Sequence, residues 1–402
     1  MAERESLLSP RLALAFATML FVSGIGNVFP VFFPPLLHEF GGSRTATALA
    51  VTLMWTAGAV LSPLAGYLVD RWSPRGLIAV GLGAAAIGLT VAAMAPTLRV
   101  FALGLGIGVG IGIAFTGMVP QAAVITADYR RRRGVATGIA FAGSMAGYVM
   151  ATPAQWVITN FGWRAAVGAY ATAIVTLIPC VWRLYPRAPA DIAAGTVVAG
   201  SVGALARKPA FWALALLFTI APHVGLLATL QHAVYFGALG FPAWEASLML
   251  LIGGVLSTSG RALAGLVGDR IGAPATGFLS FGLSLAGTLC LIGLEFWPAR
   301  VLAYGYVAFL FLPIGTRATI VSMLVPRIAP PGKFGTVFGW LSVGNSLGAA
   351  TGPLLSGALY DLTASYLVIY TVAATMVAIA LIALVIFVRG TTAEPVPLLS
   401  ER

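Results

Sequence analysis

The sequence predicts an all-α membrane protein, with twelve transmembrane helices in two pseudo-symmetric six-helix bundles. Of its 402 residues, 59% are hydrophobic and only 9% are charged, whereas a soluble domain carries about 25% charged residues. The apolar residues form twelve runs of about 20 residues or more, the length at which a helix crosses a bilayer. Sequence features of the first six runs also recur in the last six, which indicates two related halves.

One long connection, 185–209, separates the sixth run from the seventh. It is rich in alanine, glycine and proline, and it predicts the boundary between the halves. We expect an N-terminal bundle (1–184), a cytoplasmic linker (185–209), a C-terminal bundle (210–390) and a cytoplasmic tail (391–402). The apolar runs are 12–37, 45–69, 77–95, 100–126, 135–159, 165–184, 211–239, 243–268, 275–294, 301–325, 336–360 and 366–388.

The 23 lysines and arginines orient the chain in the membrane. Two lie inside runs, Arg261 and Arg317. Four fall on one side of the predicted membrane: Arg44, Arg99, Arg164 and Arg300. The others fall on the opposite side, which also holds both ends of the chain. Because basic loops stay in the cytoplasm, we expect cytoplasmic termini in a plasma membrane, for instance the bacterial inner membrane. The net charge of +11 therefore indicates topology and no nucleic-acid partner, and residues 1–10 are too polar for a cleaved signal.

Two motifs recur at nearly constant spacing. A Gly-x-x-x-Asp-Arg motif closes the second run at Gly66 and the eighth at Gly265. A second pattern matches four positions, in or directly before the fifth run, with four in or directly before the eleventh. These are Gly134, Gly138, Gly143 and Pro153, matched by Gly335, Gly339, Gly344 and Pro353. Parallel repeats of this kind are typical of transporters, which bind substrate near the midplane between the halves.

Arg261 is the most informative residue, because it is a cation inside an apolar run. The nearest acid along the run, Asp269, is eight residues away, or roughly 12 Å along a helix. A guanidinium stays charged, and its burial in lipid costs several kcal/mol unless an anion or water meets it. We therefore expect Arg261 to clamp a substrate carboxylate with two donors of its planar fork. The alternative is a structural arginine bonded to helix carbonyls.

A second arginine and two histidines are further candidates. Arg317 follows the helix-loosening Pro313 and is either a second anion contact or a side chain that snorkels to the cytoplasmic face. His223 and His232 fall on opposite helix faces, which excludes a shared metal site. His232 suits the outward end of a pathway, although a lone histidine is more often a packing residue.

Other residues are predicted to line the substrate site or to form a gate. Polar positions inside runs are lining candidates, as are three apolar positions that would shape the pocket, and helix-end charges are candidates for a cytoplasmic gate. The lining candidates are Asn27, Ser144, Tyr148, Ser257 and Asn345, with the apolar Phe29, Met118 and Met145. The gating candidates are Asp70, Arg71, Arg75, Asp269 and Arg270.

Several kinds of chemistry are excluded. All twelve acids fall at run ends, in loops or in the tails, so a coupling proton would be carried by a histidine or by the substrate carboxylate. Paired carboxylates, nucleophile–base pairs and metal-ligand clusters are missing, so we expect neither an enzyme nor a cofactor. We expect Cys180 and Cys290 to be packing residues.

The chain resembles the major facilitator superfamily along its whole length, and within it the monocarboxylate and oxalate/formate branch. The superfamily signature is Gly66, Asp70, Arg71, Arg75 and Gly76. The branch stretches are 31–40 (VFFPPLLHEF), 132–138 (RRGVATG), 142–144 (AGS), 160–164 (NFGWR), Arg261, 352–354 (GPL) and 360–361 (YD). The resemblance implies an anion-binding role for Arg261. Charged companions found in relatives are replaced by Asn27, Ser257 and Asn345, and polar or tyrosine side chains of the fourth helix are replaced near Met118.

Together these observations predict a secondary transporter of a small organic anion, most simply a lactate-like monocarboxylate. It would work by alternating access, as a monomer, and proton symport is left open. An efflux carrier of larger amphipathic compounds is an alternative from the same superfamily. A membrane receptor that does not transport is an alternative from another class.

Overall fold

The structure is a computed structural model that describes residues 9–69, 72–129, 133–185, 207–329 and 334–392. Every regular element in these ranges is helical. Nine helices are long and apolar enough to cross a membrane, or up to eleven if each of two bent pairs counts as one span. The predicted run outside that set is α19 (Phe334–Thr363), in which glycines, serines and Asn345 lower the hydropathy. An all-α membrane protein is therefore confirmed.

The N-terminal half contains the helices up to residue 184, several of them interrupted by short π or 3-10 turns. Polar caps fix where some begin: Ser9 accepts a hydrogen bond from the Leu12 amide (3.1 Å), and Ser73 accepts one from the Gly76 amide (3.2 Å). The elements are α1 (Pro10–Thr18), η1 (Met19–Ser23), α2 (Ile25–Val28), η2 (Phe29–Val31), α3 (Phe33–Phe40), α4 (Arg44–Val69), α5 (Pro74–Ala93), α6 (Leu98–Leu103), η3 (Gly104–Val109), α7 (Gly110–Thr116), α8 (Met118–Asp128), α9 (Arg133–Ala146), η4 (Gly147–Met150), α10 (Ala151–Phe161) and α11 (Trp163–Leu184).

The C-terminal half repeats this plan with longer helices. Within it, α13 packs against α19 and α20, and α15 packs against α18. Helix α15 is bent by 43° between Ala243–Arg261 and Leu263–Ile271. The elements are α13 (Pro209–Thr229), α14 (His232–Ala238), α15 (Ala243–Ile271), α16 (Ala273–Phe296), α17 (Arg300–Tyr306), η6 (Val307–Phe311), α18 (Leu312–Leu324), η7 (Val325–Arg327), α19 (Phe334–Thr363) and α20 (Tyr366–Thr392).

Glycines allow helices to approach each other closely in the N-terminal half. A Cβ atom on Gly104 would lie 2.7 Å from the Gly88 carbonyl oxygen, and one on Gly108 would overlap Gly88. The backbones of η3 and α5 are therefore in direct contact. Small residues permit this close packing in membranes, where dispersion forces replace the hydrophobic effect between helices.

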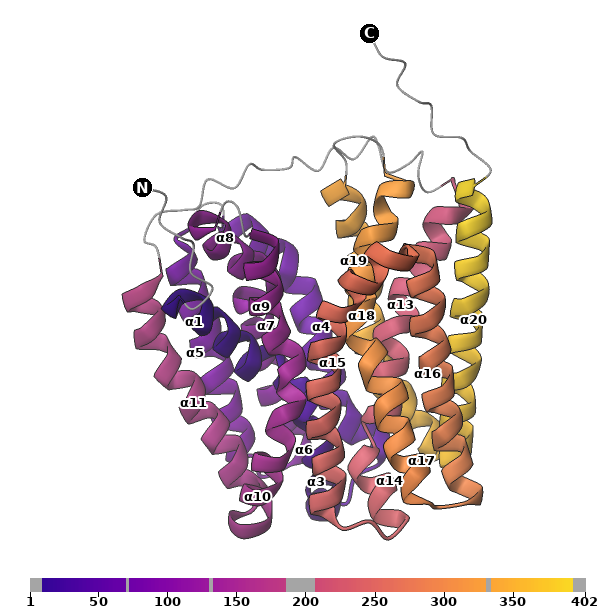
Figure 1. Ribbon diagram of the computed structural model, residues 1–402. Helices are drawn as coiled ribbons and strands as arrows, with labels where there is room; N and C mark the ends of the chain where they lie inside the picture. The colour runs from indigo at the N-terminus through magenta and orange to yellow at the C-terminus, as the bar shows by residue number, and fades with distance from the viewer. Residues whose placement is uncertain (1–8, 70–71, 130–132, 186–206, 330–333, 393–402) are drawn as a thin grey trace.

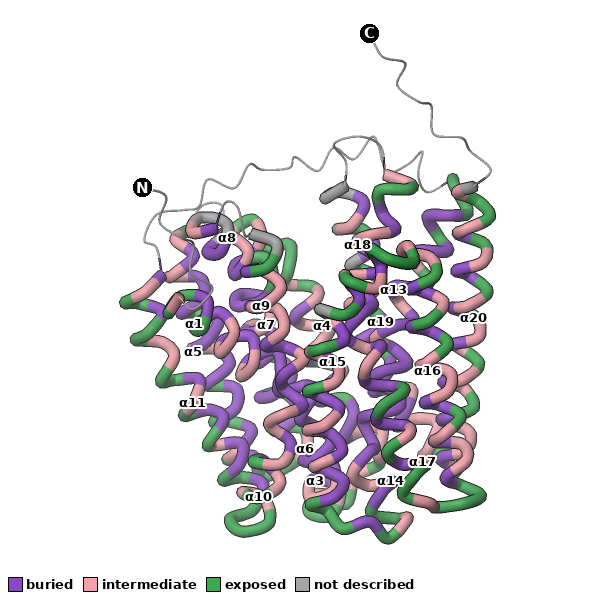
Figure 2. Tube along the Cα trace, viewed as in Figure 1, coloured by how far each residue is buried: buried purple, intermediate pink, exposed green. Residues whose placement is uncertain are grey.

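The two halves stand side by side (Figure 1), with α3, α10, α14 and α17 at one end and α8 and the last turns of α20 at the other. We call these the α14 end and the terminal end. The halves meet where α4 packs against α19, where α15 packs against η4 and α10, and where α14 contacts α3 and η2. Buried residues follow the helix faces inside each half, and exposed residues cover the outer faces and the ends (Figure 2). The two halves are therefore closest to each other at the α14 end.

Candidate functional site

Arg261 lies on α15, within the bend of that helix. Its side chain is half-buried. Its Nε atom is shielded from solvent and has no hydrogen-bond partner. Among the described residues, none forms a hydrogen bond or an ion pair with its guanidinium. The predicted isolation of this cation is therefore present in the structure, and its charge is available to an anion.

Arg317, on α18, is in a different situation. It is 5% exposed; its Nη2 donates to the Ser284 hydroxyl at 2.5 Å, and its Nη1 donates to the Ala221 carbonyl. The guanidinium carbon also lies 5.1 Å from the centre of the Phe281 ring. Arg317 thus connects α13, α16 and α18 through protein acceptors. These contacts favour a structural role over the predicted second anion contact, and they exclude snorkelling in this conformation.

Close backbone contacts fix the position of α15. A Cβ on Gly260 would overlap the Leu312 carbonyl, and a Cβ on Gly315 would overlap the Ser257 carbonyl. Ser257 is fully buried, and its hydroxyl donates to the Gly254 carbonyl at 3.1 Å. Ser257, predicted to line the site, is therefore enclosed between α15 and α18, where it sets the spacing of the helix that carries Arg261.

The predicted lining residues of the N-terminal half are mostly packed. The amide nitrogen of Asn27 donates to the Ser144 carbonyl at 2.8 Å and so joins α2 to α9. The Phe29 ring packs against Phe33 and Phe101, with centroids 6.2 and 6.4 Å away, inside the core of this half. Met118 is 50% exposed at the start of α8. Met145 is half-buried, and so is Asn345 on α19 of the C-terminal half. For Phe29 the structure favours packing over contact with a substrate.

Tyr148 lies at a close contact between the two halves, which we call the crossing point. Its ring contacts Phe311 of the other half edge to face, with centroids 5.1 Å apart. A Cβ on Gly254 of α15 would lie 2.8 Å from both the Tyr148 Cβ and the Val149 amide nitrogen. Gly254 precedes Arg261 by seven residues, roughly 10 Å along a helix. Arg261 therefore lies on the terminal-end side of this crossing point.

His232 is fully enclosed in the α14 end. Its Nε2 lies 2.9 Å from the Ala246 carbonyl oxygen and its Nδ1 lies 3.2 Å from the Tyr306 hydroxyl. Both ring nitrogens are used by protein partners, so this geometry favours packing over the predicted role on a pathway.

The sequence does not reveal the contacts that hold the α14 end together. We call this group the latch: Arg44 and Thr45 of α4, with Gln231, Asp361 and Tyr366 of the other half. The Asp361 carboxylate accepts from the Arg44 amide (3.0 Å), the Thr45 amide (2.8 Å) and the Thr45 hydroxyl (2.6 Å). The Arg44 guanidinium donates to Gln231 and Tyr366 and lies 3.3 Å from the Tyr360 ring centre. The Asp361 carboxylate of the C-terminal half therefore caps the N-terminus of α4 in the N-terminal half.

The pKa of Asp361 determines the pH range over which the latch is stable. Burial would raise the pKa of Asp361, but the hydrogen bonds from Thr45 and the Arg44 amide lower it below its usual range. A carboxylate with a lowered pKa contributes its full stabilisation above the ordinary aspartate value of about 3.9 and loses it as the pH falls through the lower value. The latch should therefore stay intact across neutral pH.

Asp361→Asn should weaken the latch by about 1–2 kcal/mol, because α4 loses a charged acceptor at its N-terminus. Opening of the α14 end is followed with a single cysteine, Ser356→Cys, in a chain in which Cys180 and Cys290 are replaced by alanine. Ser356 is fully buried, and its hydroxyl accepts a hydrogen bond from Gln231 of the latch. Faster labelling of this cysteine by a membrane-impermeant thiol reagent is expected. Arg99→Ala, at an exposed position on the same end, is the control. Equal labelling rates in both variants would contradict the assignment.

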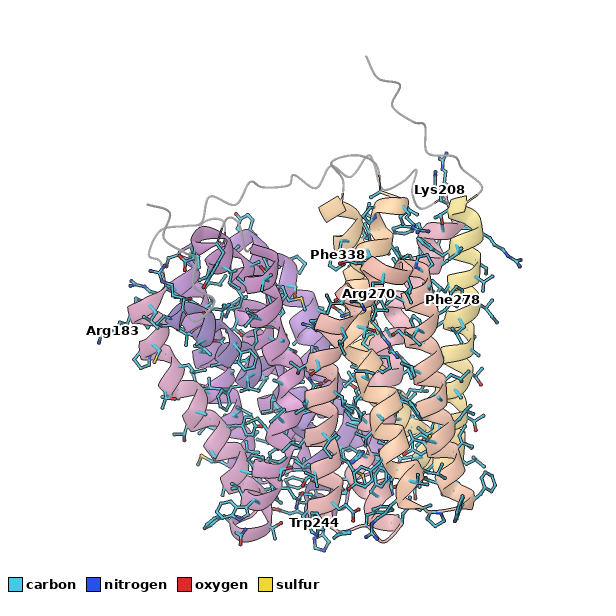
Figure 3. The ribbon with its side chains drawn as sticks, in the orientation of Figure 1. Arg183, Lys208, Trp244, Arg270, Phe278 and Phe338 are labelled. Carbon is cyan, nitrogen blue, oxygen red and sulfur yellow. The ribbon has the colours of Figure 1, made fainter. Side chains whose placement is uncertain are left out.

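Three of the predicted gating residues, Arg75, Asp269 and Arg270, lie at the terminal end. Asp70 and Arg71 fall outside the described residues. Arg75 donates to the Trp182 carbonyl at 3.1 Å, within its own half. Asp269 and Arg270 are exposed in the last turn of α15, where Figure 3 labels Arg270. Within the described part of the chain, Arg75, Asp269 and Arg270 form no hydrogen bond or ion pair between the halves, and the gate stays a prediction.

The acids of the described ranges confirm the sequence prediction. Each lies within two residues of a helix end: Glu39, Asp128, Glu245, Asp269, Glu295 and Asp361. Three pair with arginines, Asp128 with Arg11, Glu39 with Arg164, and Glu245 with Arg300. A hydrogen bond from Trp163, followed by the Arg164 contacts, lowers the pKa of Glu39.

Comparison with known proteins agrees with this architecture. The family model described as Major Facilitator Superfamily matches residues 14–324. The chain belongs to this superfamily. Monocarboxylate transporter 13 of Bos taurus is 25% identical over 378 residues, covering 89% of this chain and 84% of that protein. The oxalate:formate antiporter of Oxalobacter formigenes is 25% identical over 307 residues, covering 74% and 71%. The predicted resemblance is confirmed.

Solved structures show the same major facilitator fold. A nucleoside transporter aligns with a TM-score of 0.78 at 14% identity, covering 95% of this chain and all of that one. A D-xylose–proton symporter aligns with a TM-score of 0.77 at 15% identity, covering 97% and 100%. This superfamily member is therefore a non-enzymatic transporter.

Proposed function

We propose that this transporter carries a small monocarboxylate across the membrane by alternating access. Its substrate would bind between the halves with the carboxylate on Arg261. The contrast between two arginines of one bundle carries this proposal. Arg317 has protein acceptors for its charge, whereas Arg261 has none among the described residues. An intramembrane cation of this kind is a functional site by default.

The surroundings of Arg261 indicate the side from which a substrate would enter. Tyr148 and Phe311 meet at the crossing point, and a backbone contact at Gly254 leaves no space there. A bound anion would therefore be stopped on the α14 side and would enter from the terminal end. With basic residues concentrated at that end, the terminal end is cytoplasmic in this proposal.

Alternating access is supported by the latch. The conformation has contacts between the halves at the α14 end, and in the other conformation those contacts would separate while Asp269 and Arg270 approach the opposite half. Rocking of two rigid bundles about a fixed central site is the usual transport cycle for this architecture.

Counterflow in proteoliposomes tests the function. Vesicles loaded with unlabelled L-lactate should accumulate radiolabelled L-lactate transiently. Vesicles loaded instead with acetate, pyruvate, formate or oxalate show which sizes of carboxylate the site accepts. Counterflow of radiolabelled tetraphenylphosphonium, with none of any carboxylate, would indicate the efflux carrier instead. No counterflow, together with binding of carboxylates to the purified protein, would indicate a receptor.

A further inference from the structure

His223 has one ring nitrogen without a partner. It lies on α13 and is 9% exposed. Its Nδ1 is 2.8 Å from the Thr351 hydroxyl on α19. Its Nε2 is shielded from solvent and has no hydrogen-bond partner. This residue therefore carries an unused polar atom inside the C-terminal bundle.

The neighbouring hydrogen bond of Thr351 favours one tautomer of His223. The single proton of the Thr351 hydroxyl is donated to the Leu347 carbonyl at 2.8 Å. The hydroxyl oxygen can then only accept from His223, so Nδ1 carries the ring proton. In the neutral imidazole, Nε2 is then an unprotonated acceptor. Its lone pair is free to take a proton.

The other two histidines do not offer such an atom. In His232, the Ala246 carbonyl can only accept, so Nε2 is the donor, and Nδ1 is left to accept from the Tyr306 hydroxyl. His38 is exposed near the end of α3. Carboxylates in the described ranges are confined to helix ends. Among described side chains, His223 is thus the proton acceptor inside the bundle.

His223 and Arg261 lie in one layer of the C-terminal bundle, on either side of α18. Gly260, next to Arg261, touches the Leu312 carbonyl. A Cβ on Gly225 would lie 3.5 Å from Ile314, and Ala221 accepts the hydrogen bond of Arg317. His223 lies between these two α13 residues. Residues 312 and 314 differ by roughly 3 Å along a helix axis, so His223 and Arg261 lie at similar heights along α18.

We propose that His223 Nε2 is the proton-binding site of a proton–carboxylate symport. This inference rests on the proposed function, because it requires an anion at Arg261. Proton and substrate would load together: an imidazolium favours a nearby carboxylate, and the carboxylate favours the imidazolium by the same factor. The proton comes from water at the open side and returns to water at the other side, with no bond broken in the substrate.

The charges around His223 make an empty, protonated carrier unfavourable. α13 packs against α18, α19 and α20. From α18 comes the cation Arg317 at Ala221. The ionisable side chains of α19 are Tyr360 and Asp361, at the α14 end, and those of α20 are Tyr366 and Tyr370 near its start and Arg389 near its end. A buried imidazolium beside Arg317 therefore lacks a counterion until the substrate arrives. The empty carrier returns with His223 neutral.

Two transport assays separate coupling from transport. Proteoliposomes with an alkaline interior should accumulate radiolabelled L-lactate above the outside concentration in the wild type. His223→Gln keeps a hydrogen-bonding side chain but cannot carry a proton at neutral pH. We expect this variant to lose accumulation driven by the pH gradient while its lactate counterflow at equal pH stays within about threefold. His38→Gln is the matched control and should accumulate lactate normally.

A binding measurement keeps the proposal testable if His223→Gln transports poorly. In weakly buffered detergent solution, lactate binding to the wild type should take up close to one proton per substrate, and His223→Gln should take up none. Proton-driven accumulation or proton uptake that survives in His223→Gln would overturn the proposal and place the proton on the substrate. Wild-type counterflow without any response to the pH gradient would overturn it while leaving the proposed function intact. Absence of both counterflow and binding would instead refute the proposed function.

Discussion

Replacing Arg261 with alanine is expected to abolish lactate counterflow and to weaken lactate binding by roughly 30-fold or more. Loss of one partner from a buried, hydrogen-bonded charge pair costs about 2–5 kcal/mol, and each 1.4 kcal/mol is a factor of ten in affinity. The carboxylate would then enter a layer in which the other arginine, Arg317, is occupied by Ala221 and Ser284. Binding is measured by isothermal titration calorimetry, and transport by counterflow.

Two further variants show which property of Arg261 matters. Arg261→Lys keeps the charge but loses the planar fork, so most of the affinity should still be lost. Arg317→Met should instead lower the thermal stability, because it leaves the Ala221 carbonyl and the Ser284 hydroxyl without their donor. Wild-type lactate affinity in Arg261→Ala would show that the anion binds elsewhere.

Gly254→Leu is expected to stop transport for a different reason. A side chain at this position would collide with the backbone of Tyr148 and Val149, where the halves cross. Overpacking of a close contact costs about 1–3 kcal/mol, which shifts a two-state equilibrium by up to roughly 150-fold. The carrier would therefore be held open at the α14 end, and the Ser356→Cys reporter would be labelled rapidly.

Gly282→Leu is the control for that variant. Gly282 lies on α16, and a Cβ there would meet nothing within 4 Å, so transport and labelling should match the wild type. If the Gly254→Leu carrier kept normal turnover and a protected Ser356→Cys, the crossing point would not be part of the conformational change.

The fold follows from local features of the sequence. Long apolar runs, the basic residues at one side and the repeated Gly-x-x-x-Asp-Arg motif are all readable along the chain, and each predicts the two-bundle architecture. The exception is α19, whose glycines and Asn345 make it less apolar than the other spans. Helices that pack within a bundle can tolerate such residues, since they need not face lipid.

Only part of the site can be predicted from the sequence, because its polar side chains form hydrogen bonds with residues that are far away along the chain. The isolation of Arg261 is visible in one run. By contrast, the partners of Arg317 come from α13 and α16, and those of His232 from α15 and α17. The latch joins Arg44 and Thr45 to Asp361, more than 300 residues apart. A sequence shows that a polar residue needs a partner, but tertiary packing decides which partner it finds.

A comparison of lactate with lactamide tests whether the Arg261 guanidinium binds the carboxylate of the substrate. Lactamide has the same shape without the charge. Thermal stabilisation of the purified protein should require roughly 30-fold less lactate than lactamide in the wild type. In Arg261→Ala that difference should disappear. An unchanged preference for lactate in Arg261→Ala, or no preference in the wild type, would show that Arg261 does not bind the carboxylate.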